Sequence, residues 1–366
     1  MNTSESGQIS QAPIAPLRGA GLAVRLTAIA GAIIVTAGLF LYAGGWFTPH
    51  KLTPAAIINT FEYVNGVHPG FRRNHAKGVC VTGYFDSNGQ GQAVSKAQVF
   101  LPGRAPIVGR FALAGGKPYA DDTPGNVRSL AILFKQPDGQ EWRTAMINIP
   151  VFVVNTPQAF NEFNVASSPD PATGKNIPGA MSAFLAKHPE TTAAIKVIGQ
   201  HPFSSGFGDS PYYALNAFRF VNAQGESTPV RWSVTPDQTL QANSATATDK
   251  NYLFDGLIAQ LHAGPLRWHL ILTIGQPGDS TADATQVWPP DRRQIDAGTL
   301  TINTIESEAT SPTRDINFDP LVLPDGISPS DDPLLSARSA AYSQSFTRRE
   351  REHKEPSAIS TSEVEK

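Results

Sequence analysis

Residues 75–85, HAKGVCVTGYF, place an ionisable imidazole at the start of an apolar segment that has the composition of a β-strand. A fold that contains this run must bury the strand and also provide for a polar ring at its end. The ordinary explanation for an isolated histidine here is a structural one, with both ring nitrogens bonded to backbone. A second pattern, near the end of the chain, favours a functional explanation.

That second pattern is Arg338-Ser-Ala-Ala-Tyr342. Residues four apart on a helix lie on the same face, so the guanidinium can lie beside the phenol. A neighbouring cation favours the ionised form of a phenol. A tyrosinate is an uncommon ligand of haem iron.

Together the two patterns resemble the haem-catalase superfamily, in particular its short branch of membrane-anchored catalase-related peroxidases. The resemblance extends from about residue 60 to residue 349. Six further blocks occur in order between these ends, at residues 105–111, 127–134, 150–152, 218–226, 285–289 and 316–320. Any single block could be ordinary turn or packing sequence, but six in order make chance similarity very improbable.

The periodicity of the chain predicts an α+β fold in one body, residues 53–350. Strand-like segments occur at residues 76–85, 97–100, 106–113, 127–134, 143–154, 216–222, 229–234 and 267–274. Helical segments occur at residues 53–65, 157–167, 178–201, 252–263 and 332–349, with Thr53–Pro54 and Thr156–Pro157 as expected starts of the first two. The resemblance implies a closed antiparallel eight-stranded β-barrel with peripheral helices, preceded by one transmembrane helix.

Composition is consistent with an enzyme. The chain has 366 residues, of which 40% are hydrophobic, enough to bury a large core, and a net charge of −2 gives no reason to expect nucleic acid as a partner. The single cysteine, Cys80, excludes an intrachain disulfide and a site of several cysteines. Strand alternation places Cys80 on the face opposite to His75, and we interpret it as a small buried apolar residue.

Residues 27–47 form an uncharged, mostly apolar run that is long enough to cross a bilayer as a helix. Arg18 and Arg25 precede the run and Trp46 lies at its end, which favours a cytoplasmic N-terminus, although Lys51 lies on the other side. A cleaved signal peptide is the alternative, but no clear Ala-x-Ala site follows the run.

We therefore expect a single-pass anchor in a bacterial inner membrane with a periplasmic catalytic body. In this organisation residues 1–26 form a cytoplasmic N-terminus, of which residues 1–17 are unstructured. Residues 351–366, which are rich in charge, are expected to form an unstructured tail.

The resemblance implies roles for individual residues around a haem b. His75 becomes the distal acid and base, and Tyr342 becomes the proximal tyrosinate ligand of the iron, with Arg338 lowering its pKa. Arg72, Arg110 and Arg349 correspond to partners of the haem propionates, which prefer bidentate guanidinium groups. Phe152, Phe160 and Phe318 correspond to residues against the porphyrin or its channel.

Two positions beside the distal site depart from large catalases. Those enzymes have two adjacent asparagines before a residue and a proline, and the first asparagine is catalytic. Counting back from Pro150 places Ile147 at that first position and Asn148 at the second. Asn148 can serve the distal pocket only if a bulge or a shifted register turns it inward. Asn74, which precedes His75, replaces an aliphatic residue and can either point into the pocket or cap a turn.

A weakened distal amide should hold a second hydrogen peroxide poorly and so favour external reductants. The prediction is a haem peroxidase that reduces hydrogen peroxide or small organic hydroperoxides with an unidentified electron donor and has weak catalase activity. The long N-terminal arm and extra C-terminal domain of large catalases have no counterpart, so a monomer or dimer is expected.

Two other functions remain open. A catalase-related lipid hydroperoxide isomerase would share the tyrosine and histidine but use no donor, and the polarity of Asn74 is compatible with it. A non-catalytic haem carrier or sensor would have no need of His75. Peroxide turnover with a dye separates the carrier from both enzymes, and formation of an alcohol rather than an epoxide from a fatty acid hydroperoxide separates reduction from isomerisation.

Overall fold

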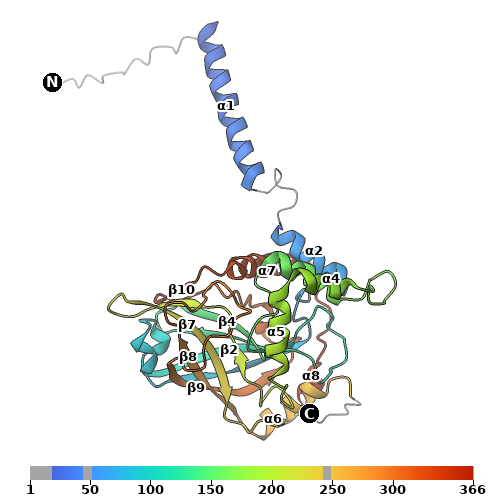
Figure 1. Ribbon diagram of the computed structural model, residues 1–366, viewed down its shortest axis with the longest axis vertical. Helices are drawn as coiled ribbons and strands as arrows, with labels where there is room; N and C mark the ends of the chain where they lie inside the picture. Colours follow the sequence, from blue (N-terminus) through green and yellow to red (C-terminus); the bar gives the residue numbers. More distant parts are fainter. Residues whose placement is uncertain (1–18, 44–51, 242–248, 366) are drawn as a thin grey trace, which may run out of the picture. The chain divides into compact units, whose positions relative to one another are not determined.

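A computed structural model describes residues 19–43, 52–241 and 249–365 (Figure 1). The chain divides into two units, residues 1–53 and 54–366, and each is described by itself. The first unit contains helix α1 (Ala20–Ala43), which at 24 residues is long and apolar enough to span a membrane. A signal sequence would meet the same criterion.

Helix α1 differs in its bounds from the expected span at residues 27–47. It begins earlier and includes Arg25, and residues 44–47 lie outside the described part of the chain. The expectation for residues 1–17 also concerns residues outside that part. Arg25 lies in the second turn of α1, close enough to its start for a long side chain to reach a membrane interface.

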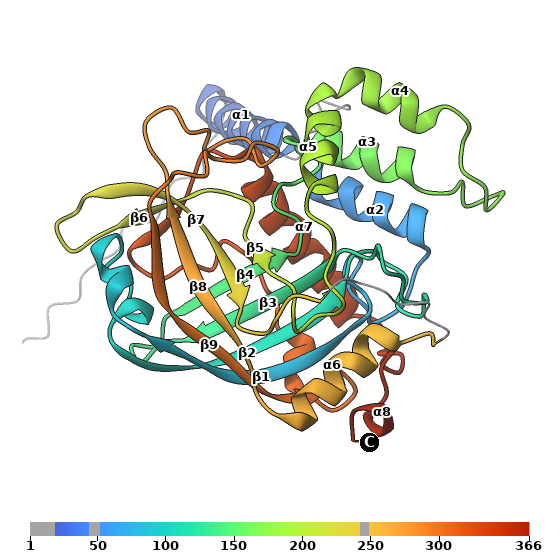
Figure 2. The same ribbon diagram turned by 60° about the horizontal axis from the view of Figure 1, so that its bottom comes forward.

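The second unit is built on a closed antiparallel barrel, as expected (Figure 2). Its eight strands follow one another around the barrel in the order β7, β5, β4, β3, β2, β1, β9 and β8, and β8 pairs with β7 to close it. Their bounds are β1 (Gly78–Ser87), β2 (Gly103–Leu113), β3 (Arg128–Lys135), β4 (Glu141–Ile147), β5 (Tyr212–Tyr213), β7 (Ser227–Pro236), β8 (Leu266–Ile274) and β9 (Gln294–Glu306). Strands β6 (Phe218–Val221) and β10 (Ile327–Pro329) extend the sheet beside β7.

The interior of the barrel is filled by large apolar side chains from alternate strand positions. Phe134 and Trp142, from neighbouring strands, stack with ring centroids 4.8 Å apart, and Trp232 meets Trp142 edge-on at 5.1 Å. These three side chains are between 0 and 3% exposed. A filled interior leaves no room for a cofactor inside the barrel, so any large cavity has to form on its outer face.

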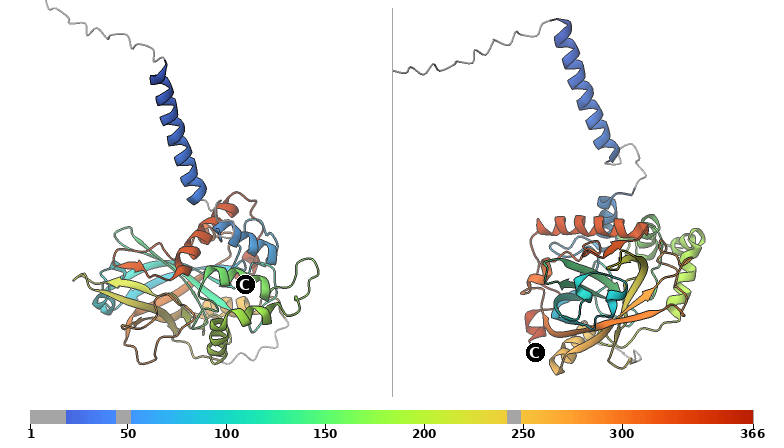
Figure 3. Two further views of the ribbon diagram at one scale, coloured as in Figure 1. Left: turned by 45° about the horizontal axis from the view of Figure 1, so that its top comes forward. Right: turned by 90° about the vertical axis from the view of Figure 1, so that its left-hand side faces the viewer.

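The helices pack outside the barrel (Figures 1 and 3). Their bounds are α2 (Pro54–Asn65), α3 (Pro157–Ser167), α4 (Ala180–Lys187), α5 (Pro189–Gly199), α6 (Tyr252–Ala263), α7 (Pro333–Glu350) and α8 (Thr361–Val364). Helices α2, α3 and α7 contact one another, and α6 and α8 contact β9. The expected start of α3 is confirmed, because Thr156 accepts a hydrogen bond from the Ala159 N–H at 3.2 Å.

Several element predictions are wrong, and local chemistry explains them. The single helix expected at residues 178–201 is broken at His188, because Pro189 disfavours a helical conformation of the residue before it. The strand expected at residues 97–100 is a 3₁₀ turn, Gln98–Phe100, and the one at residues 143–154 ends at Ile147. Strand β9 was not expected, and neither were the short strands β5 and β10.

The prediction of an unstructured tail is also wrong for residues 351–365. Ile359 is fully buried, Val364 is 6% exposed, and both belong to the main hydrophobic core. The Ser307 hydroxyl donates to the Ile359 carbonyl at 2.7 Å, and the Asn251 amide donates to Glu363 at 2.8 Å. Part of the charge that suggested disorder is bonded to the barrel body, because Glu352 pairs with the buried Arg73, and buried apolar side chains hold the rest of the segment.

Replacing Ile359 with Ala should lower the free energy of unfolding by about 2–4 kcal/mol, because it opens a cavity in a closed core. Chemical denaturation of the two proteins measures this difference. The exposed Ser362, replaced with Ala in the same segment, should change the free energy by less than about 0.5 kcal/mol. If the tail were detached from the barrel, neither substitution would change the free energy of unfolding.

Candidate functional site

A large cavity lies between the outer face of strands β2–β4 and helices α2, α3 and α7. It encloses about 1350 Å³ of empty space, including its open mouth. Space for the cavity comes from small side chains on the outer face of the barrel. They are Ser129 and Ala131 on β3 and Ala145, directly opposite Ala131, on β4. Helix α7 faces this wall with Leu334, Ala337, Arg338, Ala341, Tyr342, Ser345, Phe346 and Arg349.

Ten of the eleven predicted site residues line this cavity, although they are far apart in the sequence. They are Arg72, Asn74, His75, Arg110, Phe152, Phe160, Phe318, Arg338, Tyr342 and Arg349. The exception is Asn148. The fold therefore brings together residues that were selected on the resemblance alone, while their individual roles remain predictions.

His75 occupies an unusual backbone conformation at the cavity. Its φ of 56° lies in the left-handed region, which is uncommon for residues other than glycine, and such strain often marks a functional position. The His75 N–H donates to the Asn74 side-chain oxygen at 2.9 Å, and its carbonyl accepts from Arg110 Nη1 at 2.7 Å. The backbone on both sides of the ring is thus fixed.

The ring of His75 is neutral over a wide pH range. Burial lowers its pKa to about 3, and the guanidinium groups of Arg110, Arg338 and Arg72 act in the same direction. Its Nδ1 atom is buried without a hydrogen-bond partner among the described residues, while a backbone hydrogen bond with Leu113 acts on the ring in the opposite direction and raises its pKa. A neutral imidazole can accept a proton from a bound ligand, as a general base must.

Arg338 and Tyr342 both line the cavity from α7, as their spacing predicts. The guanidinium of Arg338 donates to the Asn216 side-chain oxygen and to the Ala145 carbonyl, the latter at 3.2 Å. Asn216 in turn donates to Asp332 at 2.7 Å, and Asp332 caps the start of α7. Arg338 is therefore held between the barrel and its own helix. No direct hydrogen bond from Arg338 to Tyr342 is present among the described residues.

Three arginines at one edge of the cavity surround a buried carboxylate, Glu308. Glu308 accepts from Arg72 Nη1 at 2.9 Å and from Arg110 Nε and Nη2 at 2.8 and 3.0 Å. Arg349 lies beside them and donates to the Arg314 carbonyl at 2.7 Å. Burial, together with the charges of Arg110 and Arg349, lowers the pKa of Arg72 to about 9, which indicates a site short of negative charge.

Cys80 lies close to this arginine cluster, on the outer face of β1. It is 1% exposed, and burial together with the charge of Glu308 raises its pKa to about 12. A thiol held in its neutral form is a poor nucleophile. The structure thus agrees with its interpretation as a small buried residue. The predicted face is wrong, because Cys80 pairs with Arg110 and lies on the side of the barrel whose cavity His75 lines.

Asn148 points away from the cavity, and its assignment as a catalytic residue is not supported. Its side-chain oxygen accepts from the Arg128 N–H at 2.8 Å, and its own N–H donates to the Arg128 carbonyl at 3.0 Å. These bonds continue the pairing of β3 with β4 past the last strand residue, Ile147, which lines the cavity. Neighbouring strand residues face opposite sides, and no bulge turns Asn148 inward.

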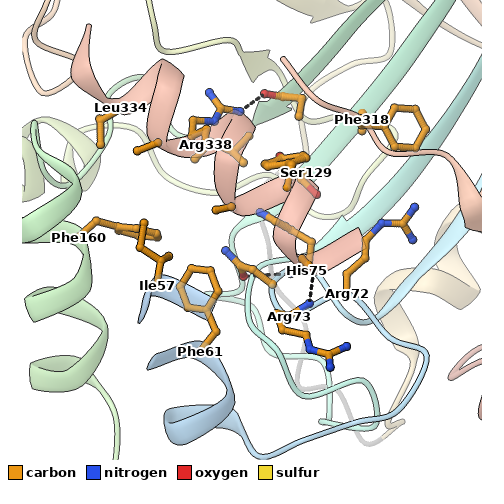
Figure 4. A pocket seen from close by; sticks show the side chains of 18 of the residues that line it. Ile57, Phe61, Arg72, Arg73, His75, Ser129, Phe160, Phe318, Leu334 and Arg338 are labelled. Atoms are coloured by element: carbon orange, nitrogen blue, oxygen red, sulfur yellow. Dashed lines mark hydrogen bonds between the residues drawn. The ribbon is translucent and has the colours of Figure 1, made fainter. Parts of the chain in front are cut away.

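The predicted aromatic residues lie on two sides of the cavity. Phe152 and Phe160 pack with ring centroids 5.2 Å apart, and Phe61 of α2 meets Phe160 edge-on at 5.8 Å. Figure 4 shows Phe61 and Phe160 together on one side of His75, with Phe318 on the other side. One wall of the cavity is therefore strongly apolar.

Several lining or supporting residues had no distinctive sequence signal. Glu308 and Asn216 are a single acidic and a single amide residue without a motif, and Ser129 and Ala131 stand out only by being small. Leu215 has a φ of 67° and lines the cavity next to Asn216. A leucine in the sequence gives no sign of this left-handed backbone conformation. Only the three-dimensional fold identifies these positions.

Comparison with known proteins agrees with this geometry. A model of the family described as Catalase matches residues 57–356. The chain belongs to the catalase family. It is 36% identical to a "Catalase-related peroxidase" of Synechococcus elongatus over 334 residues, which cover 90% of this chain and 96% of that protein. A "Catalase-related peroxidase" of Mycolicibacterium paratuberculosis is 30% identical, with 80% of this chain and 94% of that protein covered.

Large members of the catalase family match over part of their length. The catalase of Glandirana rugosa is 28% identical over 73% of this chain and 54% of its own length. Among solved structures, a fungal catalase superposes with a TM-score of 0.70 at 20% identity, covering 77% of this chain and 60% of the other. A bacterial catalase gives a TM-score of 0.69 at 21% identity. These superpositions establish the barrel fold.

The residues present fit the haem that the catalase family binds. The cavity is lined by a tyrosine on one helix and by a histidine with an unpartnered buried Nδ1 on another segment. Its arginine edge has three guanidinium groups against one carboxylate, an excess of positive charge suited to two propionates. No group of three or more His, Cys, Asp or Glu side chains able to hold a metal ion occurs among the described residues.

Replacing His75 with Asn, which tolerates a left-handed backbone, should make stability less sensitive to acid. In the folded protein the pKa of His75 is about 3, below the ordinary value of 6.5. Between pH 6.5 and 3 His75 is therefore protonated in the unfolded chain and neutral in the folded chain. Wild-type stability is therefore lost as the pH falls, by about 2 kcal/mol at pH 5 from this group alone.

Denaturation of both proteins at pH 8 and pH 5, in the same state of haem loading, measures the effect. The difference in unfolding free energy between variant and wild type should move by about 2 kcal/mol in favour of the variant at pH 5. If the unfolding free energies of the two proteins change equally between pH 8 and pH 5, folding does not lower the pKa of His75.

Proposed function

We propose that this chain is a haem peroxidase that reduces hydrogen peroxide or small organic hydroperoxides with an external electron donor. The observation that carries the proposal is the single cavity in which His75 and Tyr342 lie together with an arginine-rich edge. Bound haem, proposed to be haem b, would supply the iron that activates the peroxide and stores oxidising equivalents.

In this proposal each group of side chains in the cavity has a separate role. His75, neutral and held rigidly, takes the proton from the bound peroxide and returns it to the departing oxygen. Tyr342 would bind the iron as phenolate, and Arg338 lies on the same face of α7. Arg72 and Arg349 bind the propionates, and Phe152, Phe160 and Phe318 pack against the porphyrin or its channel.

Asn74 has a supporting part in the proposed site. Its side-chain oxygen accepts from the N–H groups of His75 and Gly115, at 2.9 and 2.8 Å. That oxygen is therefore committed to the turn and is not available to a substrate. This contact supports a turn-capping role for the Asn74 oxygen, which weakens the argument for a lipid hydroperoxide isomerase, and a neutral buried base is unnecessary in a haem carrier.

Ile147 is the basis for proposing weak catalase activity. It lies on the cavity wall directly opposite Ser129, where large catalases have an amide. An aliphatic side chain cannot hydrogen-bond a second hydrogen peroxide, so oxidation of that molecule should be slow. The reducing equivalents then come from another donor.

Replacing Ile147 with Asn should raise oxygen release from hydrogen peroxide relative to dye oxidation by about tenfold, because one added hydrogen bond is worth about 1.5 kcal/mol. Oxygen electrode and dye assays on the same preparation give the ratio. Asn148→Ala is the matched control: it should leave the ratio unchanged and lower stability by about 1–2 kcal/mol. A wild-type chain that oxidises no donor would overturn the peroxidase proposal itself.

We also propose that α1 anchors the enzyme in a bacterial inner membrane, with the catalytic unit in the periplasm as a monomer or dimer. The length and hydropathy of α1 support an anchor. Arg18 and Arg25 before or at the start of the apolar run support a cytoplasmic N-terminus.

A further inference from the structure

We propose that Glu308 and Arg110 form a buried positioning pair that holds the distal His75 in its left-handed conformation, and that Arg110 is not primarily a propionate ligand. The inference rests on the proposed function, because it treats His75 as the distal base. It changes the role that the family resemblance implies for Arg110. It also gives a role to Glu308, which no motif indicated.

The hydrogen bonds of Arg110 support this assignment. A guanidinium has five N–H groups, and those of Arg110 make four bonds within the protein. Two go to Glu308, and the other two go to the carbonyls of His75 and Ala76 at 2.7 and 3.1 Å. Only one N–H remains for any ligand, so a bidentate grip on a propionate would require these bonds to break.

The backbone at His75 needs such support. A left-handed φ of 56° is uncommon for a residue with a side chain and persists only where the surroundings enforce it. Asn74 holds the N–H of His75, the Gly115 carbonyl accepts from Ala76 N–H at 3.0 Å, and Arg110 holds the carbonyls of His75 and Ala76. Arg110 is the one side chain that contacts both carbonyls of this turn among the described residues.

Glu308 fixes the orientation of Arg110. The two side chains are 4 and 3% exposed, and the carboxylate meets the Nε and Nη2 edge of the guanidinium in a bidentate arrangement. That geometry directs Nη1 at the His75 carbonyl. The guanidinium also packs against Gly78, where a Cβ atom would approach its Cζ to 2.5 Å, so the strand leaves room for it.

The other two arginines have the free donors that a propionate needs. Arg349 donates one hydrogen bond, from Nη1 to the Arg314 carbonyl, among the described residues. Arg72 makes three, and its free N–H groups, on Nε and Nη1, lie on different edges of the guanidinium, so each can give a propionate one hydrogen bond. We therefore assign the binding of the propionates to Arg349 and Arg72, and the support of the distal base to Arg110 with Glu308.

The full-length haem protein allows a direct test with Glu308→Gln, Arg110→Gln, the double variant, and Arg349→Gln as the matched control. The first readout is the association rate of hydrogen cyanide with the ferric haem from pH 6 to 8, since a distal base must take its proton. The second is the rate of haem transfer to a haem-accepting globin. The third is hydrogen exchange of the peptide covering residues 72–80, which can be measured without haem.

Glu308→Gln and Arg110→Gln should each slow cyanide association by about tenfold or more, because a misplaced base loses its reach. Both should speed exchange in residues 72–80. Arg110→Gln should leave haem transfer within about twofold of wild type, whereas Glu308→Gln also releases Arg72 and is not used for that comparison. The double variant should be no slower with cyanide than Arg110→Gln, since both substitutions act through the same carbonyl contact. Arg349→Gln should speed haem transfer about tenfold and slow cyanide association less than Arg110→Gln does.

The opposite pattern overturns the proposal: rapid haem loss in Arg110→Gln with an unchanged cyanide rate and unchanged exchange. If Glu308→Gln fails to fold because it leaves unpaired buried cations, the double variant, which removes both charges, gives the answer. A wild-type chain that binds no haem would defeat the proposed function. The exchange comparison would then still decide whether Glu308 and Arg110 hold residues 74–76.

Discussion

The nearly buried carboxylate of Glu308 lies between the guanidinium groups of Arg72 and Arg110 and links three separate parts of the chain. Arg72 precedes the His75 turn, Arg110 lies in β2, and Glu308 follows β9. Removing one partner of a buried ion pair costs about 3–5 kcal/mol, since the other charge is left without compensation. The excess of arginine over carboxylate is suited to an anionic ligand, so the cluster belongs to the proposed site as well as to the fold.

A second constraint is the closed, filled barrel. Because Phe134, Trp142 and other large side chains fill its interior, the cofactor cavity has to lie between the barrel wall and the helices. Space for it comes from small residues on the outer face of β3 and β4, the Ala131–Ala145 pair above all. Strands β3 and β4 form one wall of the cavity, and α7 contributes Tyr342, the candidate iron ligand, on the facing side.

The sequence predicted the site better than the periphery of the fold. His75, Tyr342 and the arginines were selected by motif resemblance, and the fold gathers them around one cavity. Strand β9 escaped prediction because threonines, Gly298 and an irregular pairing with β8 between His269 and Ile271 interrupt its alternation. The ordered tail escaped prediction because two buried apolar residues, Ile359 and Val364, are hidden in a charged composition. Glu308 could not be found from sequence, because its significance depends on three arginines that meet only in three dimensions.

The central claim is that Tyr342 binds haem iron as a phenolate, and the ferric absorption and resonance Raman spectra of Tyr342→Phe test it most directly. The account predicts that the variant loses the iron–phenolate charge-transfer and vibrational bands and retains less haem than wild type, since one axial ligand is gone. Identical haem content and an identical ferric spectrum in the variant and the wild type would contradict the assignment of Tyr342 and the proposed peroxidase site built around it.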